Sequence, residues 1–258
     1  MTRSALPALL AALWWALSVP PSGAGAFQVV PVYVHLESGN PRAILTVTNT
    51  SEEELTVQLQ VMRWTQDEQG QDRLEPTTDL VFFPRLAKIG VGQERVVRLG
   101  LEKPLPAEVE TTYRLFIREL PVSKPGESVL RVAVEISLPV FLDARRPKPL
   151  PVISAAELRE GSALLRVRNT GNAHVLLKKI RVVGRGQDDR EEFVQEGMGW
   201  YVLPGIEKTF AVALPQDPCQ RCLRLQVTVE SAEGSLEQTV QVDPAQCVPP
   251  PSEAPRRS

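Results

Sequence analysis

Alternation of apolar and polar residues with a period of two runs through most of this chain, and it constrains the fold more than any other feature. In residues 55–64, polar side chains alternate with Leu55, Val57, Leu59 and Val61. A β-strand places successive side chains on opposite faces, so each such run is one half-buried strand. Segments rich in proline and glycine separate the runs, and no stretch sustains the spacing of a long helix. The sequence predicts an all-β protein built from sandwiches.

The most regular alternation lies in residues 128–141. Its even-numbered positions from 130 to 140 are all apolar: Leu130, Val132, Val134, Ile136, Leu138 and Val140. A strand here has one wholly apolar side. Periodicity does not say whether that side completes the protein's own core or is presented to a partner. Both interpretations stay open at this point.

The chain of 258 residues divides at a segment rich in proline and basic residues. Residues 143–150 are of the stiff, extended kind that suits an interdomain linker. Strand-like runs resume beyond it, and the sequence Val-x-Asn-Thr occurs in each half, at Val47 and at Val167. We expect two related sandwich domains, residues 27–142 and 151–243. The proline-rich, polar tail of residues 244–258 is predicted to be disordered.

The first 26 residues have the pattern of a secretory signal. Arg3 precedes an apolar run from Ala5 to Val19, and small residues end the segment at Ala26. This pattern predicts cleavage after Ala26. A retained membrane anchor is the alternative, which the shortness of the run disfavours. No later run is apolar enough to span a bilayer, so we expect no stable membrane insertion of the mature chain.

Three cysteines, Cys219, Cys222 and Cys247, lie near the C-terminus. Secretion exposes them to an oxidising compartment, where disulfides persist. We predict a local disulfide between Cys219 and Cys222, which leaves the pairing of Cys247 open. The alternative, redox catalysis by a Cys-x-x-Cys motif, lacks the strand-to-helix context of thioredoxin-like sites. Zinc binding is disfavoured because no second pair of ligands lies nearby.

Patterns typical of catalysis are missing from the sequence. His35 and His174 are the only histidines and fall in different predicted domains, where a lone histidine is usually a surface or packed residue. There is no nucleophile elbow, zinc-protease helix or phosphate loop. A net charge of −2 argues against nucleic-acid binding. We expect no enzymatic activity, no cofactor and no metal.

Several segments resemble the PapD-like family of periplasmic chaperones, which assemble pili and fimbriae through the chaperone–usher pathway. "FQVVPVYVHLES", "YRLFIRELP" and "SLPVF" resemble the N-terminal domain of these chaperones, and "LRVRNTGNAHVLL" and "GWYVLPG" resemble their second domain. The details are closest to the archaic branch. The resemblance implies two immunoglobulin-like sandwiches in a boomerang arrangement. It also implies a periplasmic location, with pilin subunits and an outer-membrane usher as partners.

The resemblance assigns a role to the alternating segment. In the family, the last strand of the first domain is lent to a pilin that lacks its own last strand, by donor-strand complementation. This implies that Leu130, Val132, Val134 and Ile136 fill the groove of the pilin. The competing interpretation is that the same face belongs only to the internal core.

A basic side chain that binds the C-terminal carboxylate of the pilin is the second implied element. The two anchoring cations of the type-1 and P-pilus chaperones fall near Tyr33 and on Ser137, and neither residue is basic. In the archaic branch the role passes to an arginine that matches Arg114 here. Arg98 and Arg118 are further candidates.

Two classes of function remain open from the sequence. The first is a pilus-assembly chaperone. The second is a secreted two-domain structural or adhesion protein of immunoglobulin-like fold with no chaperone activity. The interdomain ion pair of the best-known chaperones is not expected, because its glutamate matches Glu110 but its arginine falls on Phe141.

Overall fold

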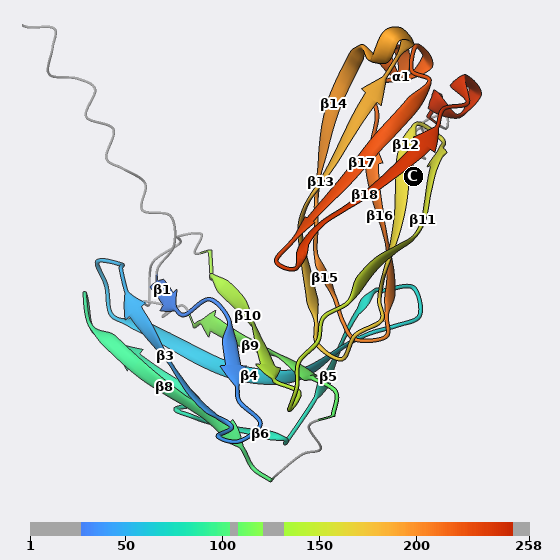
Figure 1. Cartoon of the computed structure of the whole chain (residues 1–258). Coiled ribbons are helices and arrows are strands. Elements are labelled where there is room, and N and C mark those ends of the chain that lie inside the picture. The colour runs from blue at the N-terminus through green and yellow to red at the C-terminus, as the bar shows by residue number, and fades with distance from the viewer. Residues whose placement is uncertain (1–26, 104–107, 121–131, 250–258) are drawn as a thin grey trace, which may run out of the picture.

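The computed structural model of the chain describes residues 27–103, 108–120 and 132–249. The predicted signal segment and Leu130 lie outside these residues. Within them, the strands form four sheets, two from the first half of the chain and two from the second (Figure 1). We call β1–β10 the first lobe and β11–β18 the second lobe. The all-β prediction is confirmed.

The first lobe pairs a four-stranded sheet, ordered β1-β3-β8-β6, with a larger sheet, ordered β2-β10-β9-β4-β5, in which β7 also pairs with β4. Its strands are β1 (Phe27–Val30), β2 (Val34–Leu36), β3 (Arg42–Asn49), β4 (Leu55–Gln66), β5 (Asp72–Pro76), β6 (Leu80–Phe83), β7 (Leu86–Ile89), β8 (Glu94–Leu101), β9 (Thr111–Glu119) and β10 (Glu135–Leu142). The alternating residues of β4 are buried in the core between the sheets, as expected. The chain crosses from one sheet to the other between β1 and β2.

The second lobe pairs a three-stranded sheet, ordered β11-β12-β16, with a sheet ordered β14-β13-β17-β18, to which β15 adds by pairing with β13. Its elements are β11 (Pro151–Arg159), β12 (Ser162–Asn169), β13 (Val175–Arg185), η1 (Gln187–Asp189), β14 (Glu191–Met198), β15 (Tyr201–Val202), β16 (Glu207–Ala213), α1 (Gln216–Gln220), β17 (Arg224–Ser231), β18 (Gly234–Gln241) and η2 (Pro244–Cys247). A separate hydrophobic core fills this lobe. No strand lies in residues 143–150, which connect the lobes.

The repeated Val-x-Asn-Thr sequence marks the same buried corner in both lobes. Asn49 and Asn169 are fully buried. The Nδ2 group of Asn49 donates a hydrogen bond to the carbonyl oxygen of Ile89 at 2.9 Å, and that of Asn169 donates to Val202 at 3.0 Å. A buried amide needs such partners, so each asparagine fixes a turn against a neighbouring strand.

The predicted disulfide between Cys219 and Cys222 is wrong, because Cys219 is bonded to Cys247. The helix α1 brings Cys219 against η2, where the two Cα atoms lie 5.8 Å apart, a normal span for a disulfide. Cys222 is a free, buried thiol that donates a hydrogen bond to the carbonyl oxygen of Pro218. Burial raises the pKa of Cys222. The tail was predicted to be disordered from residue 244, but residues 244–247 form η2 and are tied to α1 by this disulfide.

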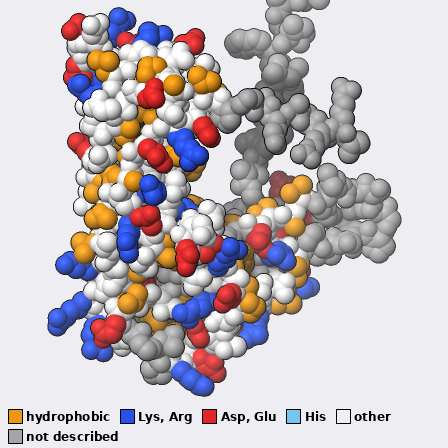
Figure 2. Space-filling model, turned by 90° about the vertical axis from the view of Figure 1, so that its right-hand side faces the viewer, with side chains coloured by type: hydrophobic (Ala, Val, Ile, Leu, Met, Phe, Trp, Pro, Cys, Tyr) orange, Lys and Arg blue, Asp and Glu red, His pale blue; other side chains and the backbone are white. Residues whose placement is uncertain are grey.

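Figure 1 shows the two lobes meeting at an angle near β5, β11 and β15. On the face shown in Figure 2, acidic and basic side chains are interspersed over both lobes. Among the residues that the structure describes, no helix is long and apolar enough to cross a membrane.

Candidate functional site

One edge of β10 is open along most of its length. Its first edge pairs with β9 from Glu135 to Leu142. Its second edge pairs with β2 only over Val140–Leu142, so residues 135–139 have no partner strand there among the described residues. An open strand edge presents unpaired backbone groups and pairs readily with another chain. This edge can accept an added strand.

The apolar side chains of this segment pass gradually from solvent into the core. Val132 is 79% exposed, whereas Leu138 is 3% exposed and Val140 is fully buried. Between them, Val134 and Ile136 are half-buried and pack against the first-lobe core. The single period-two pattern therefore serves two environments: its C-terminal part is internal core, and its N-terminal part extends beyond the core.

Arg114 lies on β9, one strand in from the open edge, directly across from Pro139 of β10. Its neighbours Tyr113 and Leu115 point into the first-lobe core, so Arg114 points to the opposite face of the sheet, towards the second lobe. Arg114 is only 8% exposed. Its Cζ atom lies 4.0 Å from the ring centroid of Trp64, 5.3 Å from that of Trp200 and 5.7 Å from that of Tyr201.

These three rings partly compensate the burial of the guanidinium. Aromatic faces are negative and attract a cation within about 6 Å, an attraction that reaches about 2 kcal/mol when water is excluded. Burial lowers the pKa of Arg114, and the charges of Asp72 and then Tyr201 act in the opposite direction. An arginine remains protonated under these conditions. The site is a desolvated cation held by aromatic rings.

No hydrogen bond or ion pair to the Arg114 guanidinium occurs in the described part of the chain. Beside it, the buried Nε1 group of Trp64 likewise has no acceptor there. A buried cation without a partner is costly, and a carboxylate is the ligand that best matches the donors of a guanidinium. The arrangement suits the binding of an external carboxylate.

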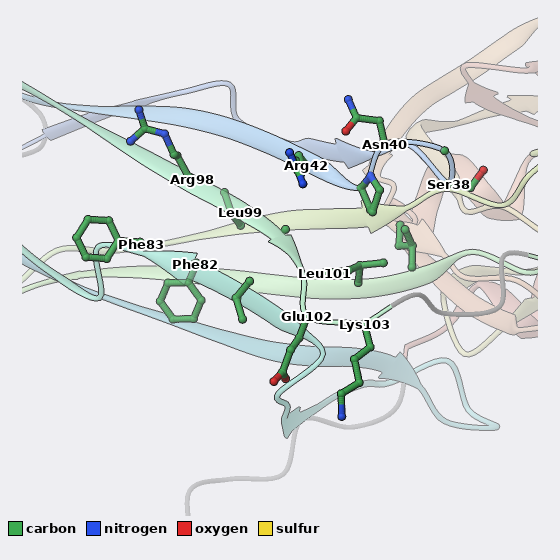
Figure 3. A pocket seen from close by; sticks show the side chains of 15 residues that line it. Ser38, Asn40, Arg42, Phe82, Phe83, Arg98, Leu99, Leu101, Glu102 and Lys103 are labelled. Carbon is green, nitrogen blue, oxygen red and sulfur yellow. The ribbon is translucent and has the colours of Figure 1, made fainter.

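The two other candidate arginines lie elsewhere. Arg118 is on the same face of β9 but is exposed and paired with Glu135, with Nε and Oε2 2.6 Å apart. Arg98 is on β8, in the other sheet of the first lobe, and faces a surface hollow of about 750 Å³ (Figure 3). Of the three candidates, only Arg114 combines burial, a place near the open edge of β10 and a guanidinium without a partner among the described residues.

A third hydrophobic cluster joins the lobes. Trp64 and Phe141 of the first lobe bury themselves against Leu203 of the second. Gln66 adds polar contacts: its Nε2 donates to the carbonyl oxygen of Tyr201, and its Oε1 accepts from the backbone N–H of Leu203, both at 2.9 Å. These contacts fix the second lobe beside the face of the first-lobe sheet that carries Arg114.

Phe141, the residue that the resemblance aligns with the arginine of the interdomain ion pair, contacts the second lobe. Its ring stacks on that of His174, with centroids 3.7 Å apart and planes 11° apart. The imidazole Nδ1 of His174 lies 2.9 Å from Oε2 of Glu110, which is also buried. His35 lies beside this stack, with its ring centroid 5.3 Å from that of Phe141 and 6.1 Å from that of His174. The two histidines, which fall in different predicted domains, thus lie near each other at the interlobe junction.

A family model covers the first lobe. Residues 26–151 match the model described as "Pili and flagellar-assembly chaperone, PapD N-terminal domain". This part of the chain belongs to the PapD family. The resemblance seen in the sequence is thereby confirmed. A search of curated protein sequences gave no match.

Solved chaperone structures share the fold of both lobes. A chain of the CsuC–CsuE chaperone–tip adhesion subunit pre-assembly complex, from archaic chaperone–usher Csu pili of Acinetobacter baumannii, is 19% identical with a TM-score of 0.60, covering 84% of this chain and 98% of that one. The CupB2 chaperone of Pseudomonas aeruginosa is 16% identical with a TM-score of 0.52, covering 84% and 100%. A chain of the Salmonella enterica SafA pilin–SafB chaperone complex is 16% identical with a TM-score of 0.52, covering 84% and 96%. At these identities the likeness establishes the fold.

The aromatic surroundings of Arg114 were not predicted from the sequence. One signal was present: Trp64 is a large, buried aromatic residue on the face of β4 that begins with Thr56, Gln58 and Gln60. The "GWYVLPG" segment, which supplies Trp200 and Tyr201, was noted only as a family feature. Nothing in the local pattern indicated that these two segments meet.

Proposed function

We propose that this protein is a periplasmic chaperone that binds pilus subunits by donor-strand complementation and delivers them to an outer-membrane usher. The observation that carries the proposal is the open edge of β10, together with the emergence of its apolar side chains from the core. Strand addition at such an edge supplies backbone hydrogen bonds, and the alternate side chains supply specificity. The predicted signal segment and the PapD-family first lobe support the periplasmic location.

The donor residues are Leu130, Val132, Val134 and Ile136. Val132 has most of its surface available, and Val134 and Ile136 retain part of theirs. Leu130 lies outside the described residues. Burying one such side chain fully stabilises a complex by about 1.5–3 kcal/mol. Association costs reduce the sum. The four side chains together supply the main apolar contact with the pilin.

Arg114 anchors the C-terminal carboxylate of the pilin in this proposal. Arg114 lies across from Pro139, where the open stretch of β10 ends. A strand that pairs with this stretch and finishes at Arg114 must approach from the side of Val132. It therefore runs parallel to β10. A charge-assisted hydrogen bond of this kind contributes about 1.5–3 kcal/mol.

Donor-strand binding is tested by co-expressing the chain with a pilin from its own gene neighbourhood and measuring how much pilin stays soluble and co-purifies. A Leu130→Asp/Val132→Asp double variant should lose capture, because two carboxylates cannot enter an apolar groove. Val91→Asp is the matched control, since Val91 is 58% exposed and lies between β7 and β8, neither of which pairs with β10. Unchanged capture by the double variant contradicts the proposal and favours a structural or adhesive role.

The anchor is tested with a peptide ending in the natural C-terminus of the pilin, prepared as a carboxylate and as a carboxamide. Wild-type protein should prefer the carboxylate by tenfold or more, as a difference of about 1.5–3 kcal/mol requires. Arg114→Ala should abolish this preference, whereas Arg98→Ala and Arg118→Ala should leave it intact. A preference that survives Arg114→Ala removes Arg114 from the role.

A further inference from the structure

Asp72 is the carboxylate whose charge acts most strongly on Arg114, yet the two are not paired. Asp72 begins β5, on the first lobe. Both of its carboxylate oxygens accept hydrogen bonds from other groups. The Nε1 group of Trp200 donates to Oδ2 at 2.9 Å, and the Nε2 group of Gln66 donates to Oδ1 at 2.9 Å.

Trp200 contacts both members of this unformed pair. Its indole N–H holds Asp72, and its ring lies 5.3 Å from the Cζ atom of Arg114. A carboxylate and a guanidinium that come into contact normally form a direct, often bidentate, ion pair. Instead, Asp72 accepts hydrogen bonds from Trp200 and Gln66, and Arg114 makes a cation–π contact with the ring of Trp200.

We propose that Trp200 is a positioning residue that keeps Arg114 open for the carboxylate of the pilin by holding the competing carboxylate of Asp72 away from it. This inference rests on the proposed function of Arg114 as the anchor. Asp72 and Gln66 belong to the first lobe, and Trp200 belongs to the second. The anchor is therefore competent only while the lobes are docked, so the second lobe takes part in pilin binding through Trp200.

The test separates the ring of Trp200 from its N–H group. Trp200→Phe keeps an aromatic face beside Arg114 and removes the donor to Asp72. Trp200 is 40% exposed, so this change should leave the thermal unfolding of the protein nearly unaltered. The probe is the peptide with the natural pilin C-terminus, as carboxylate and as carboxamide, and the measured quantity is the ratio of the two dissociation constants.

Trp200→Phe should reduce the carboxylate preference by about fivefold, the effect of one partly exposed ion pair competing for Arg114. The double variant Trp200→Phe/Asp72→Asn should restore the preference, because the competing charge is gone. Asp72→Asn alone should retain or increase it. A purely structural role for Trp200 predicts no rescue by Asp72→Asn.

Two outcomes overturn the inference while leaving the anchor in place: an unchanged ratio in Trp200→Phe, or a reduced ratio that Asp72→Asn does not restore. Arg114→Ala serves as the reference variant in the same experiment. If Arg114→Ala keeps the carboxylate preference, the anchor itself is contradicted and this inference falls with it. The two failures are thus distinguished by which variant departs from expectation.

Discussion

The two ends of the β10 segment carry the same alternation of apolar residues and lie in opposite environments. Val140 is fully buried between β9 and β2, and Val132 is 79% exposed. Both are valines at even-numbered positions of the alternating sequence, but Val140 lies within β10 and Val132 lies just before its first residue, Glu135. The difference comes from their neighbours, because β2 covers β10 only over Val140–Leu142.

This comparison shows how a strand can serve a core and a partner at the same time. The buried end is held by two neighbouring strands and fixes the direction of the segment. Residues 135–139, along the open edge, are thereby extended before any partner arrives, which reduces the conformational entropy lost on binding. The two ends should therefore respond differently to substitution.

The largest expected effect is on stability at the buried end. Val140→Asp places an unpaired carboxylate in the first-lobe core and should cost more than about 4 kcal/mol, enough to unfold a marginally stable lobe. Val132→Asp should change the free energy of unfolding by less than about 0.5 kcal/mol. Thermal unfolding followed by circular dichroism measures both. Equal destabilisation by the two variants would mean that Val132 is also internal.

Substitutions to alanine locate the boundary between the buried end and the open end. Leu138→Ala should cost about 2–5 kcal/mol, the range for removing a buried leucine side chain. Ile136→Ala should cost roughly half as much, because Ile136 is only half-buried and the cavity it leaves opens to solvent. Denaturant unfolding gives both values. A larger loss for Ile136 than for Leu138 would move the boundary towards the N-terminus of the strand.

The second lobe offers a contrast, since a covalent bond closes one of its ends. Cys247→Ala should lower the free energy of unfolding by about 2–4 kcal/mol, as expected when a disulfide is removed. Cys222→Ala should keep the bond, so the peptides that contain Cys219 and Cys247 remain linked in a non-reducing digest analysed by mass spectrometry. Linkage of Cys219 to Cys222 in the wild-type digest would instead favour the local disulfide expected from the sequence.

The smallest effect concerns pH at the buried end of β10, where His35 pairs with Asp143 at 2.7 Å. The hydrogen bond to Asp143 raises the pKa of His35 above its ordinary value, and burial acts against it. Folding therefore favours the protonated ring. Its stabilisation is complete below about pH 6.5 and is lost as the pH rises through the raised pKa.

Because the His35 side chain is 43% exposed, screening keeps this contribution below about 1 kcal/mol. The stability difference between wild type and His35→Asn, measured by denaturant unfolding, should be larger at pH 5.5 than at pH 8.5. The amount of pilin captured should not show the pH dependence of this stability difference. The opposite pH dependence would show that His35 folds in its neutral form.

Much of the fold was accessible from the sequence, because strands leave a local record. The alternation in residues 55–64 predicted β4 and its buried face, and the family resemblance led to Arg114. The Cys219–Cys247 bond was not predicted, since spacing along the chain does not encode which cysteines meet. The stacking of Phe141 on His174 and the contact of Trp200 with Arg114 were missed for the same reason. Both of these contacts, unlike the disulfide, join segments from different lobes.

The sequence by itself predicted an extended segment with one apolar side over residues 130–140, and β10 forms this segment from Glu135 onward. That property is local, because backbone geometry sets a side-chain period of two in any strand. Only the tertiary structure decided which part of that side is covered. Burial depends on whether distant segments such as β2 lie alongside, and their placement follows from the packing of the whole lobe.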